Sequence, residues 1–324
     1  MSYRYLEREE LKYTFLLCSI MDHDAAIEDL LKYCRGLGLF HGLDTMEKVR
    51  NRVLTLVNEL RDSSLLLAGS TSESFDMHDV VRDVAIAIAS RERRWLALGK
   101  EDVFEEWKDT MRNSHLVSLK YAKVSQLPDE LECPNLTFFF MHGFVEVPNN
   151  FFKGMQRLNV LEFDGTNFTT LPSSLGFLKT LCTLRLIDCG LKDIVIFGEL
   201  ENLEILDLRY SGIEMLPLSK LEELYLYDSF DGWEIEGIEN PRSKASLMEL
   251  HHLPRLATLE VHIPDVEAIP KDNLFLGKME RFKISIGYEK WDSYFDREMK
   301  TPRMLKLEIN KSIDLVEGIY KLLS

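Results

Sequence analysis

One leucine pattern recurs from about residue 116 to the end of this 324-residue chain. The unit is L-x-x-L-x-L, as in Leu158, Leu161 and Phe163. Its L-x-L part has the alternation of a short strand, which turns both apolar side chains to one side. A single strand of this kind cannot bury that side alone, so successive units must stack. The pattern therefore predicts a solenoid with a curved parallel sheet.

The pattern occurs about nine times, and most copies start about 20–25 residues apart, the period of leucine-rich repeats. Residues 116–324 are therefore expected to form the repeats, with the last one incomplete at the C-terminus. Steps such as Leu127-Pro128 mark the convex side, where a proline removes no sheet hydrogen bond. The ninth copy consists of Met304, Leu307 and Ile309. The nine copies start at Leu116, Leu136, Leu158, Leu181, Leu203, Leu221, Leu256, Met279 and Met304.

Small polar residues hold the turn after three of these strands, at Thr166, Cys189 and Ser211. We expect them to satisfy backbone groups between neighbouring coils, with the cysteine buried rather than reactive. An interruption of the period contains Trp233, which is expected to pack over the core. The adjacent pair at 251–252, two histidines, is rejected as a metal site because neighbouring side chains on a helix point apart.

The residues between the strand leucines face the concave side of the predicted solenoid. They form a mixed surface of charged groups and exposed aromatic rings, which suits protein recognition rather than small-molecule chemistry. The acids among them are either solvated or hold a basic segment, and the sequence leaves both open. The candidate partner-binding residues are Phe138, Phe140, Glu162, Asp164, Arg185, Asp207, Arg209, Tyr225 and Tyr227.

Residues 1–92 lack the repeat and predict three amphipathic helices followed by a β-hairpin, which is the order of a winged helix. Asp24 is expected to cap the second helix, and Asp44 with Glu47 to form a capping box before the third. The hairpin strands are expected at 63–68 and 75–77. The predicted fold class is therefore α/β, a helical winged-helix domain followed by a leucine-rich-repeat solenoid.

Winged helices often bind DNA through a helix in the major groove, and the third helix here carries Lys48, Arg50 and Arg52. The chain as a whole argues against this, because it carries 54 acidic and 39 basic residues and a formal net charge of -15. A field of that sign repels nucleic acid and anionic lipid surfaces. A solvated helix face is the favoured interpretation of these three cations.

A polar turn and a further helix follow the hairpin, and residues 93–115 are expected to be a linker and the cap of the first coil. His78, within Met77-His78-Asp79, is the histidine whose position stands out. The helix after it is expected to bury one apolar face, formed by Val80, Val81, Val84, Ala85 and Ile88.

The cysteine content and the N-terminal sequence bear on the cellular compartment. Five cysteines without a CxxC pair indicate neither a disulfide framework nor a structural zinc site. The first residues are not those of a signal peptide, and no apolar run approaches the length of a membrane span. We therefore expect an intracellular, cytoplasmic protein.

A winged helix that ends in Met-His-Asp-Val-Val-Arg-Asp-Val-Ala and precedes L-x-x-L-x-L repeats with Leu-Pro steps resembles the plant intracellular NB-LRR (NLR) disease-resistance proteins of the coiled-coil class. The resemblance covers nearly the whole chain. Further blocks that match the family lie at 13–19, 28–31, 36–40, 51–53 and 63–67.

The resemblance implies a role for His78. In the family this histidine contacts the β-phosphate of bound ADP and helps to hold the receptor in its off state. Met77 and Asp79 would support His78, and Asp79 would also cap the next helix. The alternative is that His78 only satisfies a turn. The nucleotide role requires an upstream nucleotide-binding module.

The phosphate-binding half of that sensor is missing from this sequence. The chain contains no G-x-x-x-x-G-K-[ST], no acids of a Walker B motif and no coiled coil. One histidine cannot replace the backbone amides and lysine of a P-loop. We therefore expect this chain alone to bind neither ADP nor ATP appreciably, and we interpret it as a C-terminal fragment of such a receptor.

The leading hypothesis is a plant innate-immunity receptor fragment. Its repeats would bind a pathogen effector, a guarded host protein or the receptor's own nucleotide-binding module. A stand-alone interaction scaffold or decoy is the second hypothesis, and a winged-helix DNA binder is the third. An enzyme is the least favoured, because no nucleophile, acid–base or metal-ligand arrangement is recognisable in the sequence. No catalytic residue and no metal site are therefore expected.

Overall fold

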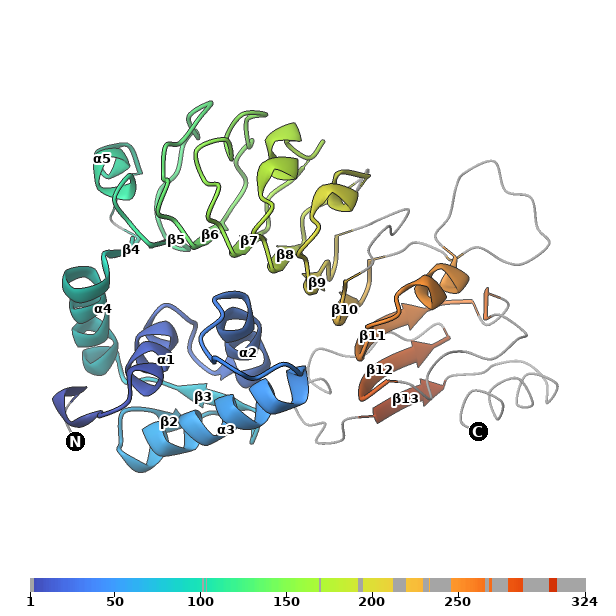
Figure 1. Cartoon of the computed structure of the whole chain (residues 1–324), viewed down its shortest axis with the longest axis horizontal. Coiled ribbons are helices and arrows are strands. Elements are labelled where there is room, and N and C mark those ends of the chain that lie inside the picture. Colours follow the sequence, from blue (N-terminus) through green and yellow to red (C-terminus); the bar gives the residue numbers. More distant parts are fainter. Residues whose placement is uncertain are drawn as a thin grey trace.

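The computed structural model describes residues 3–100, 102, 104–168, 170–191, 195–211, 220–229, 233, 246–265, 268–269, 279–287 and 303–307. Within these residues the chain forms a helical domain followed by a long curved sheet, as expected from the sequence. The sheet arches around the helical domain, so that the N-terminal helices lie on its concave side (Figure 1).

The helical domain has the topology of a winged helix. Its three short strands form an antiparallel sheet in the order β1-β3-β2. Helices α1 to α3 share one core with this sheet, in which Phe15, Leu30 and Val53 are almost completely buried. The elements are α1 (Glu9–Ser19), β1 (Ala25–Ala26), α2 (Ile27–Gly36), α3 (Met46–Asp62), β2 (Leu67–Ala68), β3 (Ser74–Asp76) and α4 (Asp79–Arg93).

Two of the expected helix caps are wrong. Asp24 does not cap α2, because the carboxylate of Asp24 accepts hydrogen bonds from Ser70 and Ser74 in the hairpin. Helix α2 instead begins after Ala26, which has an extended backbone and no capping side chain. Thr45 caps α3, since its hydroxyl oxygen accepts from the backbone N–H of Lys48 at 3.4 Å. In both places the expected carboxylate has another partner, because Asp24 bonds to the hairpin and Asp44 pairs with Lys48.

The strand expected at 63–68 is shorter, because Leu65 and Leu66 turn into the core and only Leu67–Ala68 pairs as β2. The expected buried face of α4 is also partly wrong. Val80 and Val84 are 64% and 53% exposed. The helix instead packs through its small residues Ala85 and Ala89, which allow close approach to α1.

The solenoid contains one parallel sheet whose strands follow sequence order. Its first strand, β4, lies within the segment expected to be a linker and first-coil cap. The convex side carries the short helix α5 (Lys108–Met111) and 3-10 turns at Phe104–Glu106, Ser173–Phe177, Val195–Glu199 and Leu247–His252. The strands are β4 (Trp95–Ala97), β5 (Leu116–Leu119), β6 (Phe138–His142), β7 (Val160–Asp164), β8 (Thr183–Ile187), β9 (Ile205–Asp207), β10 (Glu223–Leu226), β11 (Thr258–Ile263), β12 (Arg281–Ile286) and β13 (Arg303–Leu307).

The core of the solenoid lies between the sheet and the convex return segments, and it contains the repeat residues of the second to eighth copies. The expected register of the first copy is wrong by two residues. Val117 and Leu119 face this core and pair with Phe139 and Met141, whereas Leu116 belongs to the core shared with the helical domain and Tyr121 is 47% exposed.

The turn residues bond across coils as expected. The hydroxyl of Thr166 donates to the carbonyl of Gly143 at 2.9 Å. The hydroxyl of Ser211 accepts from the backbone N–H of Cys189 at 3.0 Å. Trp233 packs in the core at 2% exposure and donates its indole N–H to the carbonyl of His262, as its expected packing role requires.

The expected register of the ninth repeat is wrong. Leu307 pairs with Ile286 rather than with Phe282, a shift of four residues along β12. An even shift keeps the same side chains facing the core, so periodicity alone could not decide between the two registers. Ile309 and the expected unfinished end of the last repeat lie outside the described residues.

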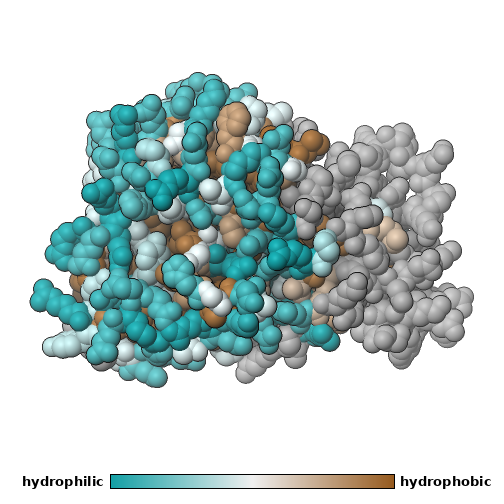
Figure 2. Space-filling model, in the orientation of Figure 1, coloured by the Kyte–Doolittle hydropathy of each residue, from teal (hydrophilic) through white to brown (hydrophobic). Residues whose placement is uncertain are grey.

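The surface on the face shown in Figure 2 is largely hydrophilic over the described residues, with hydrophobic residues in small, scattered patches. No helix in the described part of the chain is both long and apolar enough to cross a bilayer.

Candidate functional site

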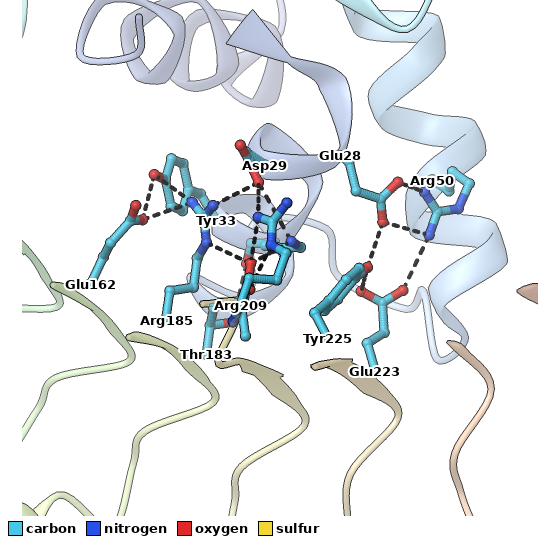
Figure 3. A network of polar contacts seen from close by, with 12 residues as sticks. Glu28, Asp29, Tyr33, Arg50, Glu162, Thr183, Arg185, Arg209, Glu223 and Tyr225 are labelled. Carbon is cyan, nitrogen blue, oxygen red and sulfur yellow. Dashed lines mark hydrogen bonds and ion pairs between the residues drawn. The ribbon is translucent and has the colours of Figure 1, made fainter. Parts of the chain in front are cut away.

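Helix α2 lies against the concave face of the sheet, where one of its sides meets strands β6 to β10 (Figure 3). The close approach of the α2 backbone to the sheet depends on Gly36, the last residue of the helix. A Cβ atom on Gly36 would lie 2.5 Å from a methyl carbon of Val160 and 2.6 Å from the hydroxyl oxygen of Thr183. The hydroxyl of Thr183 also donates to the carbonyl of Lys32 at 3.1 Å. A glycine at this position therefore lets the helix backbone rest directly on β7 and β8.

Tyr33 connects the helix to β7 and β8. Its hydroxyl donates to a carboxylate oxygen of Glu162 at 2.6 Å, and Arg185 donates to both groups at 2.9 and 2.8 Å. The ring of Tyr33 meets that of Phe138 edge-on, with 5.0 Å between centroids. Burial raises the pKa of Glu162 in spite of the guanidinium beside it. The triad thus joins two packed surfaces through fully satisfied polar groups.

Asp207 on β9 is the centre of the network and is completely buried. It accepts hydrogen bonds from Lys32 at 2.8 Å, from Arg209 at 2.8 Å and from Arg185 at 3.3 Å. The ammonium group of Lys32 also lies 3.6 Å from the ring centroid of Tyr225. Burial alone would raise the pKa of Asp207, but the three cations hold this pKa well below its usual range. Asp207 is therefore charged, and Lys32 is the cation that reaches it from the helical domain.

A second cluster joins α2 and α3 to β10. Arg50 pairs with Glu28, and it reaches a carboxylate oxygen of Glu223 at 3.1 Å. The hydroxyl oxygen of Tyr225 lies 2.7 Å from Glu28 and 2.9 Å from Glu223, although one hydroxyl hydrogen can serve only one carboxylate at a time. A proton on one carboxyl group would complete these bonds. Burial and the charge of Glu28 raise the pKa of Glu223 to about 7, whereas the pKa of Glu28 is lowered by Arg50 in spite of burial. Glu223 is therefore the carboxyl group of this pair that takes up a proton first as the pH falls.

Arg35 extends the contact to the edge of the sheet where β9 and β10 begin. Its Nε atom donates to Glu204 at 2.7 Å, and its terminal nitrogen lies 3.5 Å from Glu222. Asp29, in the first turn of α2, accepts from Arg185 at 2.7 Å. The helix therefore meets the sheet through ion pairs at both of its ends.

The nine predicted concave residues do lie on one face, but the expected exposure of the aromatic rings is wrong. Phe138 and Phe140 are at most 3% exposed, and Tyr225 and Tyr227 at most 6%. The physical reason is that Phe138, Phe140 and Tyr225 belong to the core shared with the helical domain. Glu162, Arg185 and Asp207 are buried with them, whereas Asp164 is partly exposed beside His142. Their role in binding an external partner stays a prediction.

The other half of this interface comes from α2 and α3. From the sequence Arg50 is a candidate only as a solvated cation, and the α2 residues have no assigned role. A signal was present, because Tyr33 and Gly36 interrupt what would otherwise be a polar, solvated side of α2. The expectation that the three cations of α3 form a solvated face is wrong for Arg50, whose side chain is only 13% exposed, whereas Lys48 is 55% exposed. Lys48 pairs with Asp44, Arg50 with the second cluster, and Arg52 with Glu10.

The Met-His-Asp turn lies apart from this network, because His78 makes no hydrogen bond or ion pair to the concave residues in the described part of the chain. Met77 is buried, whereas His78 is exposed and caps α4 by accepting from the backbone N–H of Val80 at Nδ1, 3.3 Å away. The expectation that Asp79 caps α4 is therefore wrong. A neutral ring that accepts at Nδ1 carries its hydrogen on Nε2, and this N–H can donate to an anionic group.

No protein-family model matches the chain. Three Arabidopsis thaliana proteins are similar to it. Disease resistance protein At4g27190 is 28% identical across 89% of this chain and 33% of its own length. Probable disease resistance protein At4g27220 is 30% identical across 82% and 33%. Probable disease resistance protein At1g61300 is 29% identical across 99% and 45%. The chain thus spans about a third of the length of the first two relatives.

Two solved structures show a weaker likeness. An internalin from Listeria monocytogenes has a TM-score of 0.44 at 15% identity and covers 72% of each chain. The leucine-rich repeat domain of the type III effector XopL has a TM-score of 0.33 at 12% identity, covering 94% of this chain and 92% of that one. Both TM-scores are below 0.5, and these structures carry no information about function.

Proposed function

We propose, since this chain belongs to the plant disease-resistance proteins of the NLR type, that it is the part of a defence receptor in which the repeats recognise a protein and the winged-helix domain controls access to them. The chain spans only about a third of those first relatives. The switching and signalling of a whole receptor are therefore part of the proposal.

The observation that carries this proposal is the occupation of the concave face by α2. The buried ion pair between Lys32 and Asp207 and the contact of Gly36 with the sheet close the surface that the repeats offer to a partner. A partner and the helical domain cannot occupy that surface together. Binding a pathogen effector or a guarded host protein would therefore favour release of the winged helix, in proportion to the difference in affinity for the two states.

Hydrogen exchange read by mass spectrometry tests the closed state. In the natural chain, the amides of α2 and of β7 to β10 should be protected together. Lys32→Glu places a carboxylate against Asp207, so α2 should exchange faster while the strands stay protected. The matched control is Lys48→Glu, which lies on an exposed part of α3. Equal protection of α2 in both variants and the natural chain would contradict the proposal.

We also propose that His78 contacts a nucleotide phosphate only when an upstream module supplies the rest of the site. When bound, the nucleotide would supply a phosphate anion. The chain's own contribution is the N–H of His78 Nε2, held in place by the bond from Val80 to Nδ1. Calorimetry with the isolated chain should show no ADP binding. Micromolar or tighter binding that survives His78→Ala would place the site elsewhere, and binding lost in that variant would show that no upstream module is needed.

The repeats and the relatives favour binding rather than catalysis, and a cytoplasmic location stays a prediction. A stand-alone scaffold or decoy would show the same closed face. Co-expression with a full-length relative in leaf tissue separates the two, because a receptor fragment should change the immune response and a scaffold without switching should not. DNA binding has lost support, since Arg50 and Arg52 are engaged in ion pairs. A gel shift at physiological salt should show no retardation.

A further inference from the structure

The sheet residues that pair with α2 and α3 form an acidic surface, here called the acidic face. It contains five carboxyl groups and two guanidinium groups. Helix α2 has no formal net charge, because Glu28 and Asp29 offset Lys32 and Arg35. The remaining cation, Arg50, is contributed by α3. The acidic face consists of Glu162, Arg185, Glu204, Asp207, Arg209, Glu222 and Glu223.

The size of this face suits one short helix that crosses the strands. Gly36 rests on β7 and β8, Lys32 reaches β9, and Glu28 reaches β10. A ten-residue helix is roughly 15 Å long. Four parallel strands span roughly 14 Å between the outer two. One helix can therefore contact every strand of the face.

The chemistry of the face restricts what can replace α2. An apolar helix would leave Asp207 buried without Lys32, which is costly. A partner also needs a hydroxyl group at the position of Tyr33, because Glu162 and Arg185 both bond to it. These requirements exclude a generic hydrophobic surface.

We propose that the acidic face recognises a basic α-helix carrying a tyrosine next to a lysine, and that an external protein partner opens the chain by presenting such a helix in place of α2. This inference rests on the proposed function. Because α2 is neutral whereas the face is acidic, a more basic helix can bind more tightly than α2 itself. A cation at the position of Glu28 also removes the carboxylate whose charge helps to keep Glu223 protonated. Glu223 can then ionise and pair with that cation directly, a contact that Arg50 makes in the closed chain.

A cavity beside α2 exposes part of the concave side of the sheet. It has a volume of about 550 Å³ and lies between the hairpin and strands β6 to β12, and Asp29, Lys32 and Tyr33 form part of its wall. Arg281 also lines it. Side chains of an incoming helix can therefore reach the sheet before α2 has left.

The test uses the full chain and four stapled, fluorescent peptides of residues 27–36. The staple joins positions 30 and 34, which face the helical domain's own core in the chain. The basic peptide carries Glu28→Arg, and the others are the natural sequence, the basic peptide with Tyr33→Phe, and a scrambled peptide of the basic composition. Fluorescence anisotropy is read with the natural chain and with Gly36→Val, whose side chain would clash with Val160 and Thr183.

The basic peptide should bind the Gly36→Val chain about tenfold more tightly than the natural-sequence peptide, as one added partly buried ion pair requires. Tyr33→Phe should cost about tenfold, because it leaves polar groups of the face unpaired. The inference is overturned if the scrambled peptide binds with the same affinity as the basic peptide. It is also overturned if no peptide binds to an opened chain. If Gly36→Val does not fold, Arg35→Glu serves as the opening variant with the same expected order of affinities.

Hydrogen exchange on the same samples separates the two levels of the proposal. If α2 is protected in the natural chain and released in the variant, but the peptides show no preference, only the partner chemistry is wrong. If α2 is unprotected in the natural chain, the proposed closed state itself fails.

Discussion

Replacing Asp207 by asparagine removes one charge from the centre of the interface and changes little else. The two side chains have nearly the same shape, so packing against the sheet should be preserved. Three cations lose the carboxylate that they share. Its Oδ2 atom lies 2.8 Å from a side-chain nitrogen of Lys32, 2.8 Å from one of Arg209 and 3.3 Å from one of Arg185. The substitution therefore isolates the electrostatic contribution to docking.

The expected loss in the free energy of unfolding follows from the burial of the pair. Asp207 and Lys32 are 0% and 1% exposed, so water cannot replace the lost charge without opening the contact. Removing one partner of a buried pair costs about 3–5 kcal/mol. The asparagine oxygen can still accept one hydrogen bond, so about 3 kcal/mol is expected for Asp207→Asn. That is a large part of the ~5–15 kcal/mol that stabilises a folded domain.

Urea unfolding followed by circular dichroism measures the total loss. A double-mutant cycle with Lys32→Met measures the share that crosses the interface, which should be about 1–3 kcal/mol for groups in direct contact. Asp164→Asn is the matched control on the same face. Its carboxylate is partly exposed and pairs with His142, so it should cost no more than about 0.5 kcal/mol.

The reasoning would be refuted by a loss below about 1 kcal/mol for Asp207→Asn. Additive effects of Asp207→Asn and Lys32→Met would refute it as well, because the 2.8 Å contact requires coupling.

The remaining predictions concern pH, the turn ladder and the thiols. Glu223 has a pKa raised from 4.5 to about 7, so the folded chain keeps a proton that the unfolded chain releases, and stability from this group should fall by about 3 kcal/mol as pH rises from 4.5 to 7. Glu223→Gln should remove this pH dependence in urea unfolding. Ser211→Ala should cost about 1–3 kcal/mol, because it leaves the backbone N–H of Cys189 buried and unpaired, whereas the exposed Ser72→Ala should cost almost nothing. Burial raises the pKa of Cys133 and Cys189 to about 12, so neither thiol should react with a disulfide reagent at pH 8 until the chain unfolds.

Each of these three predictions can be contradicted by a specific result. An unchanged pH slope in Glu223→Gln would show that the proton belongs to another group. Equal losses for Ser211→Ala and Ser72→Ala would remove the ladder bond as a source of stability. Rapid labelling of Cys189 in the folded chain would contradict its burial.

The solenoid and the winged helix were accessible from the sequence because their signals are local and periodic. Leu161 and Phe163 repeat the alternation of a buried strand, and Ser211 occupies a turn position whose bonds reach only the neighbouring coil. Helix starts were harder to predict, since Thr45 and Asp44 are both good capping residues and the sequence pattern does not choose between them. The register of β13 could not be predicted because a shift of four residues preserves the pattern.

The sequence by itself determined which residues form the curved sheet and which of them face its concave side, because strand alternation and repeat period depend on neighbours along the chain. Only the tertiary structure decided what covers that side. Lys32 and Asp207 are 175 residues apart and carry no periodic signal that relates one to the other. Their pairing arises from the curvature of the stacked coils, which brings α2 against the sheet and turns an expected open surface into a closed one.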